Sequence, residues 1–72
     1  MSIQKRLKNL REDVDKSQEE IAKLLGTSQS YYAKYESGKI AIPFERIIVL
    51  AEYYNVSIDY IAGLIDVPRK LK

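Results

Sequence analysis

The 72-residue chain contains no cysteine, no histidine and only three glycines. Without cysteine it forms neither a disulfide nor a thiolate metal site, and without histidine it lacks the commonest general base and metal ligand. Three glycines supply neither a glycine-rich phosphate loop nor a nucleophile elbow. We therefore predict a protein that is not an enzyme and that has no catalytic residue, metal, cofactor or evident small-molecule ligand.

Long hydrophobic runs are also missing. No apolar stretch approaches the roughly 20 residues that cross a bilayer, and the N-terminus lacks the apolar block of a secretory signal. We expect a cytoplasmic protein with no membrane partner. A chain of 72 residues forms one domain, close to the lower size limit for a core that no disulfide or metal supports.

The net charge of +2 is too small to indicate a nucleic-acid partner by itself, but the charges are unevenly distributed. Residues 1–16 carry five basic side chains against three acidic ones, whereas residues 41–65 carry one basic side chain against three acidic ones. Three more basic residues gather at the end of the chain: Arg69, Lys70 and Lys72. A polarised surface is therefore expected.

Apolar residues recur at the spacing of buried helix faces in five segments, and no strand pattern competes. The segments are residues 2–14, Gln18 to Leu25, the residues between Ser28 and Gly38, Phe44 to Tyr54, and a short one from Ser57 to Gly63 or Leu64. The expected inward residues are, in order, Ile3, Leu7, Leu10 and Val14; Ile21, Leu24 and Leu25; Tyr32 and Tyr35; Ile47, Leu50, Ala51 and Tyr54; and Ile58, Ile61 and Leu64. This pattern predicts an all-α fold of five helices.

The second and third segments are joined by a sharp turn. Gly26 suits the left-handed conformation that ends a helix, and Thr27 or Ser28 can cap the helix that follows. Gly38 ends that helix in turn. Such a pair can form a helix-turn-helix, in which one helix braces the next and the second offers its first turns to the DNA major groove.

The polar residues of the third segment favour DNA over the simpler interpretation. Compact helical proteins that bind no DNA also contain two helices joined by a glycine turn. Here, however, the outward residues Gln29, Ser30 and Lys34 can bond bases or phosphates without the repulsion that carboxylates cause. We therefore interpret residues 17–39 as a DNA-reading unit.

Four motifs in register point to a known family. RLKNLRE is similar to the family's first helix, SQEEIAKLLGTS to its bracing helix and turn, YESGK to the end of its recognition helix, and LAEYYNVSIDYI to its last two helices. Together they resemble the lambda-repressor-like, or Xre-type, family of phage-repressor helix-turn-helix proteins over about residues 3–65. The resemblance implies a compact five-helix domain at residues 1–65, with helices two and three forming the helix-turn-helix, and a basic tail at residues 66–72.

The same resemblance implies a sequence-specific transcriptional regulator that binds double-stranded DNA, a repressor that acts as a homodimer on a palindromic operator. One small module binds weakly, whereas two copies place their recognition helices about 34 to 36 Å apart, one turn of DNA. The candidate dimer contacts are the apolar residues Leu64, Ile65, Val67 and Leu71, some of which must complete the core.

The resemblance also implies roles for individual polar residues. The base-reading positions are Gln29, Ser30 and Lys34. The phosphate-binding positions are Gln18, Tyr31, Ser37 and Lys39. Glutamine is suited to adenine and lysine to guanine. Arg11 and Glu36 match positions that form a partly buried ion pair holding the recognition helix, the alternative being two unpaired surface charges.

Two departures from the family pattern bear on the fold. Asp15 stands where the family often has glycine at the end of the first helix, so a strained or longer turn is expected there. Tyr32 and Tyr35 replace aliphatic inward residues, and their hydroxyls need a partner or water if buried. With Tyr31 they offer a base-stacking platform as an alternative, but core and phosphate roles suit a duplex reader better.

An alternative function employs the same helices to bind a polypeptide, as an antitoxin or an adaptor does. Salt separates the two hypotheses. Binding to DNA through several phosphates weakens steeply between about 50 and 200 mM salt, whereas the protein-interaction hypothesis predicts binding that is insensitive to salt.

Overall fold

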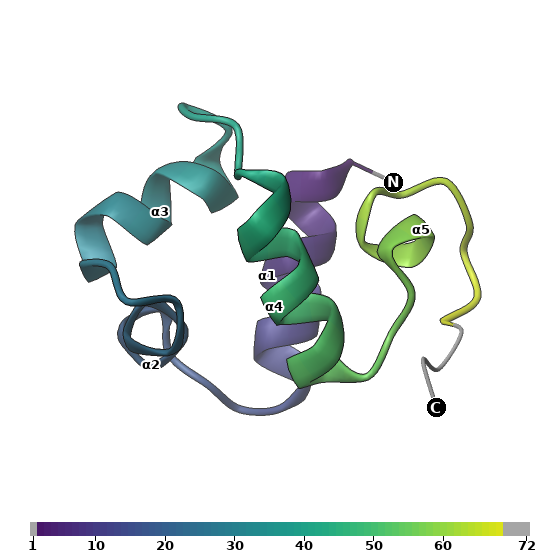
Figure 1. Cartoon of the computed structure of the whole chain (residues 1–72), viewed down its shortest axis with the longest axis horizontal. Helices are drawn as coiled ribbons and strands as arrows, with labels where there is room; N and C mark the ends of the chain where they lie inside the picture. The colour runs from purple at the N-terminus through teal and green to yellow at the C-terminus, as the bar shows by residue number, and fades with distance from the viewer. Residues whose placement is uncertain (1, 69–72) are drawn as a thin grey trace.

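The computed structural model of the chain describes residues 2–68 and contains the five expected helices within them. They are α1 (Ile3–Asp13), α2 (Gln18–Leu25), α3 (Gln29–Ser37), α4 (Phe44–Tyr54) and α5 (Ile58–Ile61). No strand occurs among the described residues, so the all-α prediction is confirmed. Figure 1 shows α2 and α3 at one end of the long axis, α4 crossing the middle in front of α1, and α5 at the other end.

Serine side chains begin four of the five helices. Ser2, Ser17, Ser28 and Ser57 each accept a hydrogen bond from a backbone N–H in the first turn that follows, which satisfies a donor the helix cannot pair itself. Ser17 also donates its own N–H to the Glu20 carboxylate at 3.0 Å, which completes a capping box. These hydrogen bonds from Ser17 hold the pKa of Glu20 below its ordinary value.

Left-handed residues end the helices. Gly26, at φ +74°, and Gly38, at φ +81°, end α2 and α3 as the sequence predicted. Asn55 adopts φ +56° after α4. Asp15 also adopts φ +56°, and a side chain in this conformation costs about 1–2 kcal/mol where glycine would cost little. The turn after α1 is therefore the strained one that the sequence predicted.

The core is built from apolar side chains of all five helices and of Val56. Its fully buried members include Leu7, Ile21, Leu50 and Ile61. Tyr32 and Tyr35 are also buried, at 0% and 2% exposure, and their rings meet edge to face with centroids 6.0 Å apart. The Tyr35 hydroxyl accepts a hydrogen bond from Arg46 Nη1 at 3.3 Å.

Three residues expected to face inward are exposed instead. Val14 follows the last residue of α1 and so leaves the helical stripe. Leu24 lies on the edge of α2, because Ala22 is buried in its place beside Ile21. Leu64 is 76% exposed, because α5 ends three residues earlier, at Ile61, and the chain turns away.

The chain after α5 returns to α1 through Arg6, which is only 3% exposed. Its guanidinium lies 3.8 Å from the centre of the Tyr60 ring, 3.5 Å from the Ile65 carbonyl oxygen and 3.6 Å from the Asp66 carboxylate. Arg6 thus connects α1 with α5 and with the segment after it.

The basic residues expected in the tail lie outside the described residues, as does one of the candidate dimer contacts. These residues are Arg69, Lys70, Leu71 and Lys72. Within residues 2–68, none of the helices has the length and apolar character that a membrane span requires.

Candidate nucleic-acid interface

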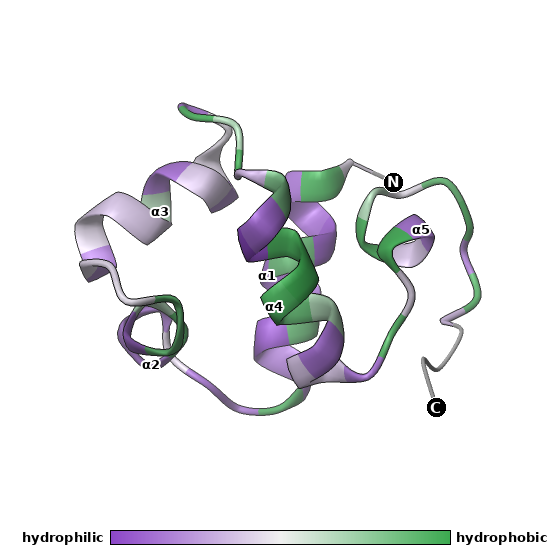
Figure 2. Cartoon of the chain, viewed as in Figure 1, coloured by the Kyte–Doolittle hydropathy of each residue, from purple (hydrophilic) through white to green (hydrophobic). Residues whose placement is uncertain are grey.

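The polar first turns of α3 are open to solvent. Gln29, Ser30 and Lys34 are exposed, while Tyr32 and Tyr35 of the same helix are buried. Figure 1 shows α3 at the end of the molecule, and Figure 2 colours it mostly in pale and hydrophilic shades. A helix that packs through two tyrosines and leaves its leading polar edge free meets the steric requirement for entering a groove.

The turn between α2 and α3 fixes the direction of the exposed helix. The backbone N–H of Thr27 donates to the Ala22 carbonyl at 2.9 Å, and that of Gly26 donates to Lys23 at 3.1 Å. Ser28, rather than Thr27, supplies the cap of α3. Ala22 is 1% exposed, and its small side chain allows close packing against the core.

Arg11 and Glu36 join α1 to the end of α3. Arg11 donates from Nε to Glu36 Oε2 at 2.8 Å and from Nη2 to Oε1 at 3.1 Å, a bidentate pair. Its Nη1 donates to the Lys16 carbonyl oxygen at 2.9 Å, so the guanidinium also holds the turn after α1. The two side chains are 12% and 4% exposed.

The electrostatics of this pair follow from its surroundings. Burial by itself raises the pKa of Glu36, but hydrogen bonds, first from Arg11, outweigh burial and keep the pKa below its ordinary value. The hydrogen bond to Glu36 raises the pKa of Arg11 in turn. Both groups are therefore charged at neutral pH.

Gln18 links this ion pair to the exposed helix. Its Nε2 donates to Glu36 Oε1 at 3.1 Å, and its Oε1 accepts from Gln29 Nε2 at 2.7 Å. A continuous series of hydrogen bonds therefore runs from Arg11 through Glu36 and Gln18 to Gln29. The sequence predicted roles for all four residues and the pairing of Arg11 with Glu36, but not the hydrogen bonds of Gln18 to Glu36 and Gln29. The only signal for them is that Gln18 and Gln29 are each the first residue of a helix.

The other predicted contact residues surround this network on α3 and just after it. Tyr31 is 42% exposed, and Lys34 Nζ lies 5.6 Å from the centre of its ring. Ser37 Oγ donates to the Lys34 carbonyl oxygen at 3.3 Å, and Lys39 is exposed. Because Tyr32 and Tyr35 are buried, the three tyrosines do not form a base-stacking platform.

A comparison with curated proteins finds regulators of transcription and one antitoxin. The chain is 38% identical over 63 residues to an uncharacterized HTH-type transcriptional regulator, YobD of Bacillus subtilis, and 36% identical over 63 residues to the cryptic phage CTXphi transcriptional repressor RstR of Vibrio cholerae. Each alignment covers 88% of this chain and 56% of the relative. Antitoxin PezA of Streptococcus pneumoniae is 34% identical over 61 residues, covering 85% of this chain and 39% of PezA.

A structural comparison and a family comparison find the same class of protein. A transcriptional regulator from Listeria innocua superposes with a TM-score of 0.83 and 30% sequence identity, covering 89% of this chain and 60% of that one. The chain thus spans little more than half the length of the regulators it matches. A helix-turn-helix family model matches residues 7–61, the part that carries α2, α3 and most of the core. The chain belongs to the lambda-repressor-like, Xre-type helix-turn-helix family of DNA-binding transcriptional regulators.

Proposed function

We propose that the chain is a repressor that recognises a specific sequence of double-stranded DNA and acts as a homodimer on a palindromic operator. The observation that carries this proposal is the free polar edge of α3, braced by α2 and by the Arg11–Glu36 pair. Doubling the module supplies two recognition helices and twice the phosphate contacts.

Gln29 is the main base-reading residue in this proposal, and the hydrogen-bond network explains how its amide is oriented. The Glu36 carboxylate can only accept, so Gln18 turns its NH2 group toward Glu36 and its oxygen toward Gln29. Gln29 must then offer an N–H to Gln18. Its oxygen and its second N–H remain for a base, and adenine presents the complementary pair in the major groove.

Ser30 and Lys34 read neighbouring positions. Ser30 tolerates several bases, since its hydroxyl both donates and accepts, whereas Lys34 suits guanine, which presents two acceptors. Both side chains are exposed on the same helix as Gln29. Together the three residues favour an operator half-site that contains adenine and guanine at nearby positions.

The phosphate contacts in this proposal surround the base-reading residues. Gln18 stands at the N-terminus of α2, where free backbone N–H groups and the helix dipole favour an anion. Tyr31, Ser37 and Lys39 are exposed along and after α3. These contacts supply affinity and register without selecting a sequence.

Genomic selection of bound fragments, followed by a salt titration on the selected site, tests the proposal. We expect a palindromic consensus with half-sites one turn apart and a log affinity that falls steeply between about 50 and 200 mM salt. The similarity to antitoxin PezA gives the protein-interaction alternative a specific basis. No selected fragment, together with salt-insensitive binding to a polypeptide, would favour that alternative.

A further inference from the structure

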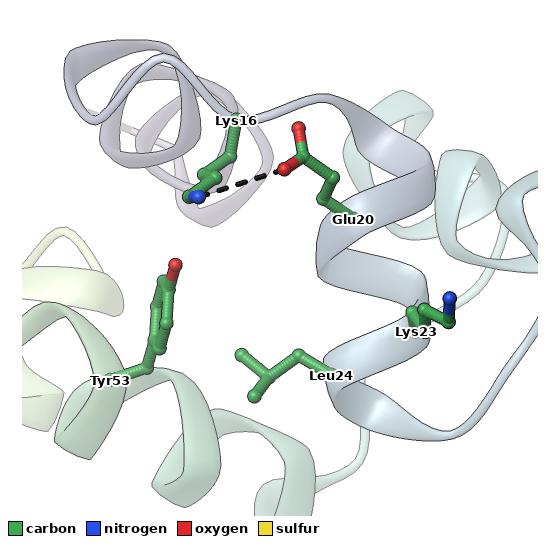
Figure 3. Close-up of a pocket in the computed structure, with 5 residues that line it drawn as sticks. All are labelled: Lys16, Glu20, Lys23, Leu24 and Tyr53. Atoms are coloured by element: carbon green, nitrogen blue, oxygen red, sulfur yellow. Dashed lines mark ion pairs between the residues drawn. The ribbon is translucent and has the colours of Figure 1, made fainter.

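Two exposed apolar side chains from different helices line one groove. Leu24 of α2 and Tyr53 of α4 are both 43% exposed, and Figure 3 shows Leu24 extending from α2 toward α4 and Tyr53 rising from α4 into the same space. The groove between α2 and α4 that they line encloses about 460 Å³. Exposed apolar side chains on a concave surface are typical of a site that another molecule covers.

Both walls of this groove are held by the packing beneath them. The Tyr53 ring meets the half-buried Tyr54 ring edge to face, with centroids 5.2 Å apart. On the opposite wall, Leu24 belongs to a helix whose neighbouring residues Ile21 and Ala22 are buried in the core. A partner therefore meets a preformed surface and has few side chains to order.

The rest of the lining is charged, with two lysines against one glutamate: Lys16, Lys23 and Glu20. The Glu20 carboxylate is already engaged, because Lys16 Nζ lies 3.6 Å from it and the backbone N–H of Ser17 donates to it at 3.0 Å. An ion pair as exposed as that of Lys16 and Glu20 contributes little, so Lys16 can turn to another carboxylate at small cost. The charge of the lining therefore favours an acidic partner.

We propose that the groove between α2 and α4 binds a helix of a partner polypeptide that carries acidic side chains on either side of an apolar stripe. The apolar stripe covers Leu24 and Tyr53, and the acidic side chains pair with Lys16 and Lys23. This is the mode in which an amphipathic helix lies in a hydrophobic groove. The partner is not DNA, so the inference does not depend on operator recognition.

The positions of the two lysines set the spacing of the partner's acidic residues. Lys16 directly precedes the Ser17 cap of α2, and Lys23 lies in the last turn of that helix. Seven positions of a helix correspond to roughly 10 Å along its axis. A partner helix that runs alongside α2 places carboxylates seven residues apart at the same separation, and residues three and four positions after the first carboxylate share that face. These two positions hold the apolar side chains that enter the groove.

The apolar walls favour a polypeptide over other anionic surfaces. A DNA strand presents phosphates to the lysines but offers no apolar side chain to cover Leu24 and Tyr53. Proteins that bind membranes through a helix do so with an apolar face that projects into the lipid, whereas Leu24 and Tyr53 line a hollow. A helix with both apolar and acidic residues matches the two parts of the lining at once.

A nuclear magnetic resonance titration of the 72-residue chain tests the proposal. The probe is a synthetic alanine-rich helical peptide with glutamates seven residues apart and leucines three and four positions after the first glutamate. We expect the signals of Lys23, Leu24 and Tyr53 to shift saturably, with a dissociation constant of about 0.1–1 mM, as for a small interface. A matched peptide with glutamines in place of the glutamates should bind about fivefold more weakly.

Variants of the chain separate local charge from overall charge. Lys23→Glu should weaken peptide binding by about tenfold, because it replaces attraction with repulsion. Lys5→Glu is the matched control, since it makes the same change of net charge at an exposed position on α1, outside the groove. It should leave peptide affinity within about twofold of wild type. Lys23→Gln, expected to weaken binding by about threefold, replaces Lys23→Glu if circular dichroism shows that the latter does not fold.

The apolar part of the groove has its own test. Leu24→Ala should weaken peptide binding by about fivefold, because it removes a side chain that the peptide covers. No saturable shift at millimolar peptide, equal binding of the glutamate and glutamine peptides, or equal losses in Lys23→Glu and Lys5→Glu would each overturn the proposal. Shifts of Leu24 and Tyr53 that anionic vesicles or self-association cause, and that the peptide does not, would assign the groove to that other occupant.

Discussion

The α2–α3 end of the molecule and the part built from α4 and α5 are stabilised in different ways. At the α2–α3 end, polar side chains are held by one another, and Glu36 alone accepts three hydrogen bonds from two residues. The buried side chains of α4 and α5 are apolar instead, and large apolar side chains such as Val49 still remain exposed. The first end is organised to fix the orientation of exposed polar groups, whereas the second has apolar surface left to bury.

The largest expected loss of stability comes from removing the carboxylate at the centre of the polar network. Glu36→Ala leaves Arg11 partly buried without its carboxylate and removes the acceptor of Gln18, which should lower the free energy of unfolding by about 3 kcal/mol. Urea denaturation measures the change. Lys16→Ala is the control, because it removes an exposed ion pair worth about 0–1 kcal/mol. Equal losses for the two variants would show that the Arg11 pairing contributes nothing special.

A pH series sharpens the comparison between the ends. Because the folded pKa of Glu36 is lowered from 4.5, its contribution is complete above about pH 4.5 and is lost as pH falls through the folded pKa. The stability difference between wild type and Glu36→Ala should therefore shrink in acid. Leu50→Ala, which removes a fully buried apolar side chain of α4, should cost about 3 kcal/mol at every pH. A Glu36 difference that does not vary with pH would contradict the assigned charge.

Base recognition gives the next effect. Gln29→Ala should lose about 1–3 kcal/mol of binding free energy on the preferred site and relax selectivity at one base pair, because it removes a bidentate contact. Gel-shift titrations on the preferred site and on single-base variants of it measure both quantities. The same loss on every sequence would argue that Gln29 touches only the DNA backbone.

Relief of backbone strain gives a smaller effect of opposite sign. Asp15→Gly should raise the free energy of unfolding by about 1 kcal/mol, since glycine adopts φ +56° without the side-chain penalty. Asn55→Gly, at the end of α4, is the comparison, since Asn55 has the same φ and is a residue type that tolerates this conformation better. A melting temperature that falls in Asp15→Gly would mean that the Asp15 side chain makes a compensating contact.

The smallest effect concerns a single phosphate contact. Lys39→Ala should weaken all DNA sequences similarly and reduce the slope of log affinity against log salt by about one unit. Lys23→Ala, measured on a half-site, is the matched control because Lys23 lines the groove on α2. An unchanged slope for Lys39→Ala would remove this residue from the interface.

Much of the fold could be predicted because its signals are local. The bounds of α2 follow from Ser17, which caps it, and Gly26, which ends it, and both act on the neighbouring backbone. The errors arose where tertiary packing decides. Leu24 has the right spacing for burial, but the core accepts Ala22 instead, and no local rule chooses between them.

In the candidate site, too, local patterns predicted some features and tertiary packing decided others. The exposure of Gln29 could be expected, since two tyrosines take the inward positions of α3. The hydrogen bond from Gln29 to Gln18 spans eleven residues and depends on the angle between α2 and α3, which periodicity does not contain. Ile48 and Val49 lie outside the inward stripe that the sequence predicted for α4, and both are exposed in the structure.

The ion pair of Arg6 with Asp66, with Nη2 3.6 Å from Oδ1, ties the first helix to the last described segment through their side chains. A variant that joins α1 to the segment after α5 through a linker, with new ends opened in the loop between α3 and α4, tests whether the order of the helices matters to the fold. A circular permutant of this design should fold with α3 intact. In this domain, the exposed surface should then depend on how the helices pack and not on the order in which the chain joins them.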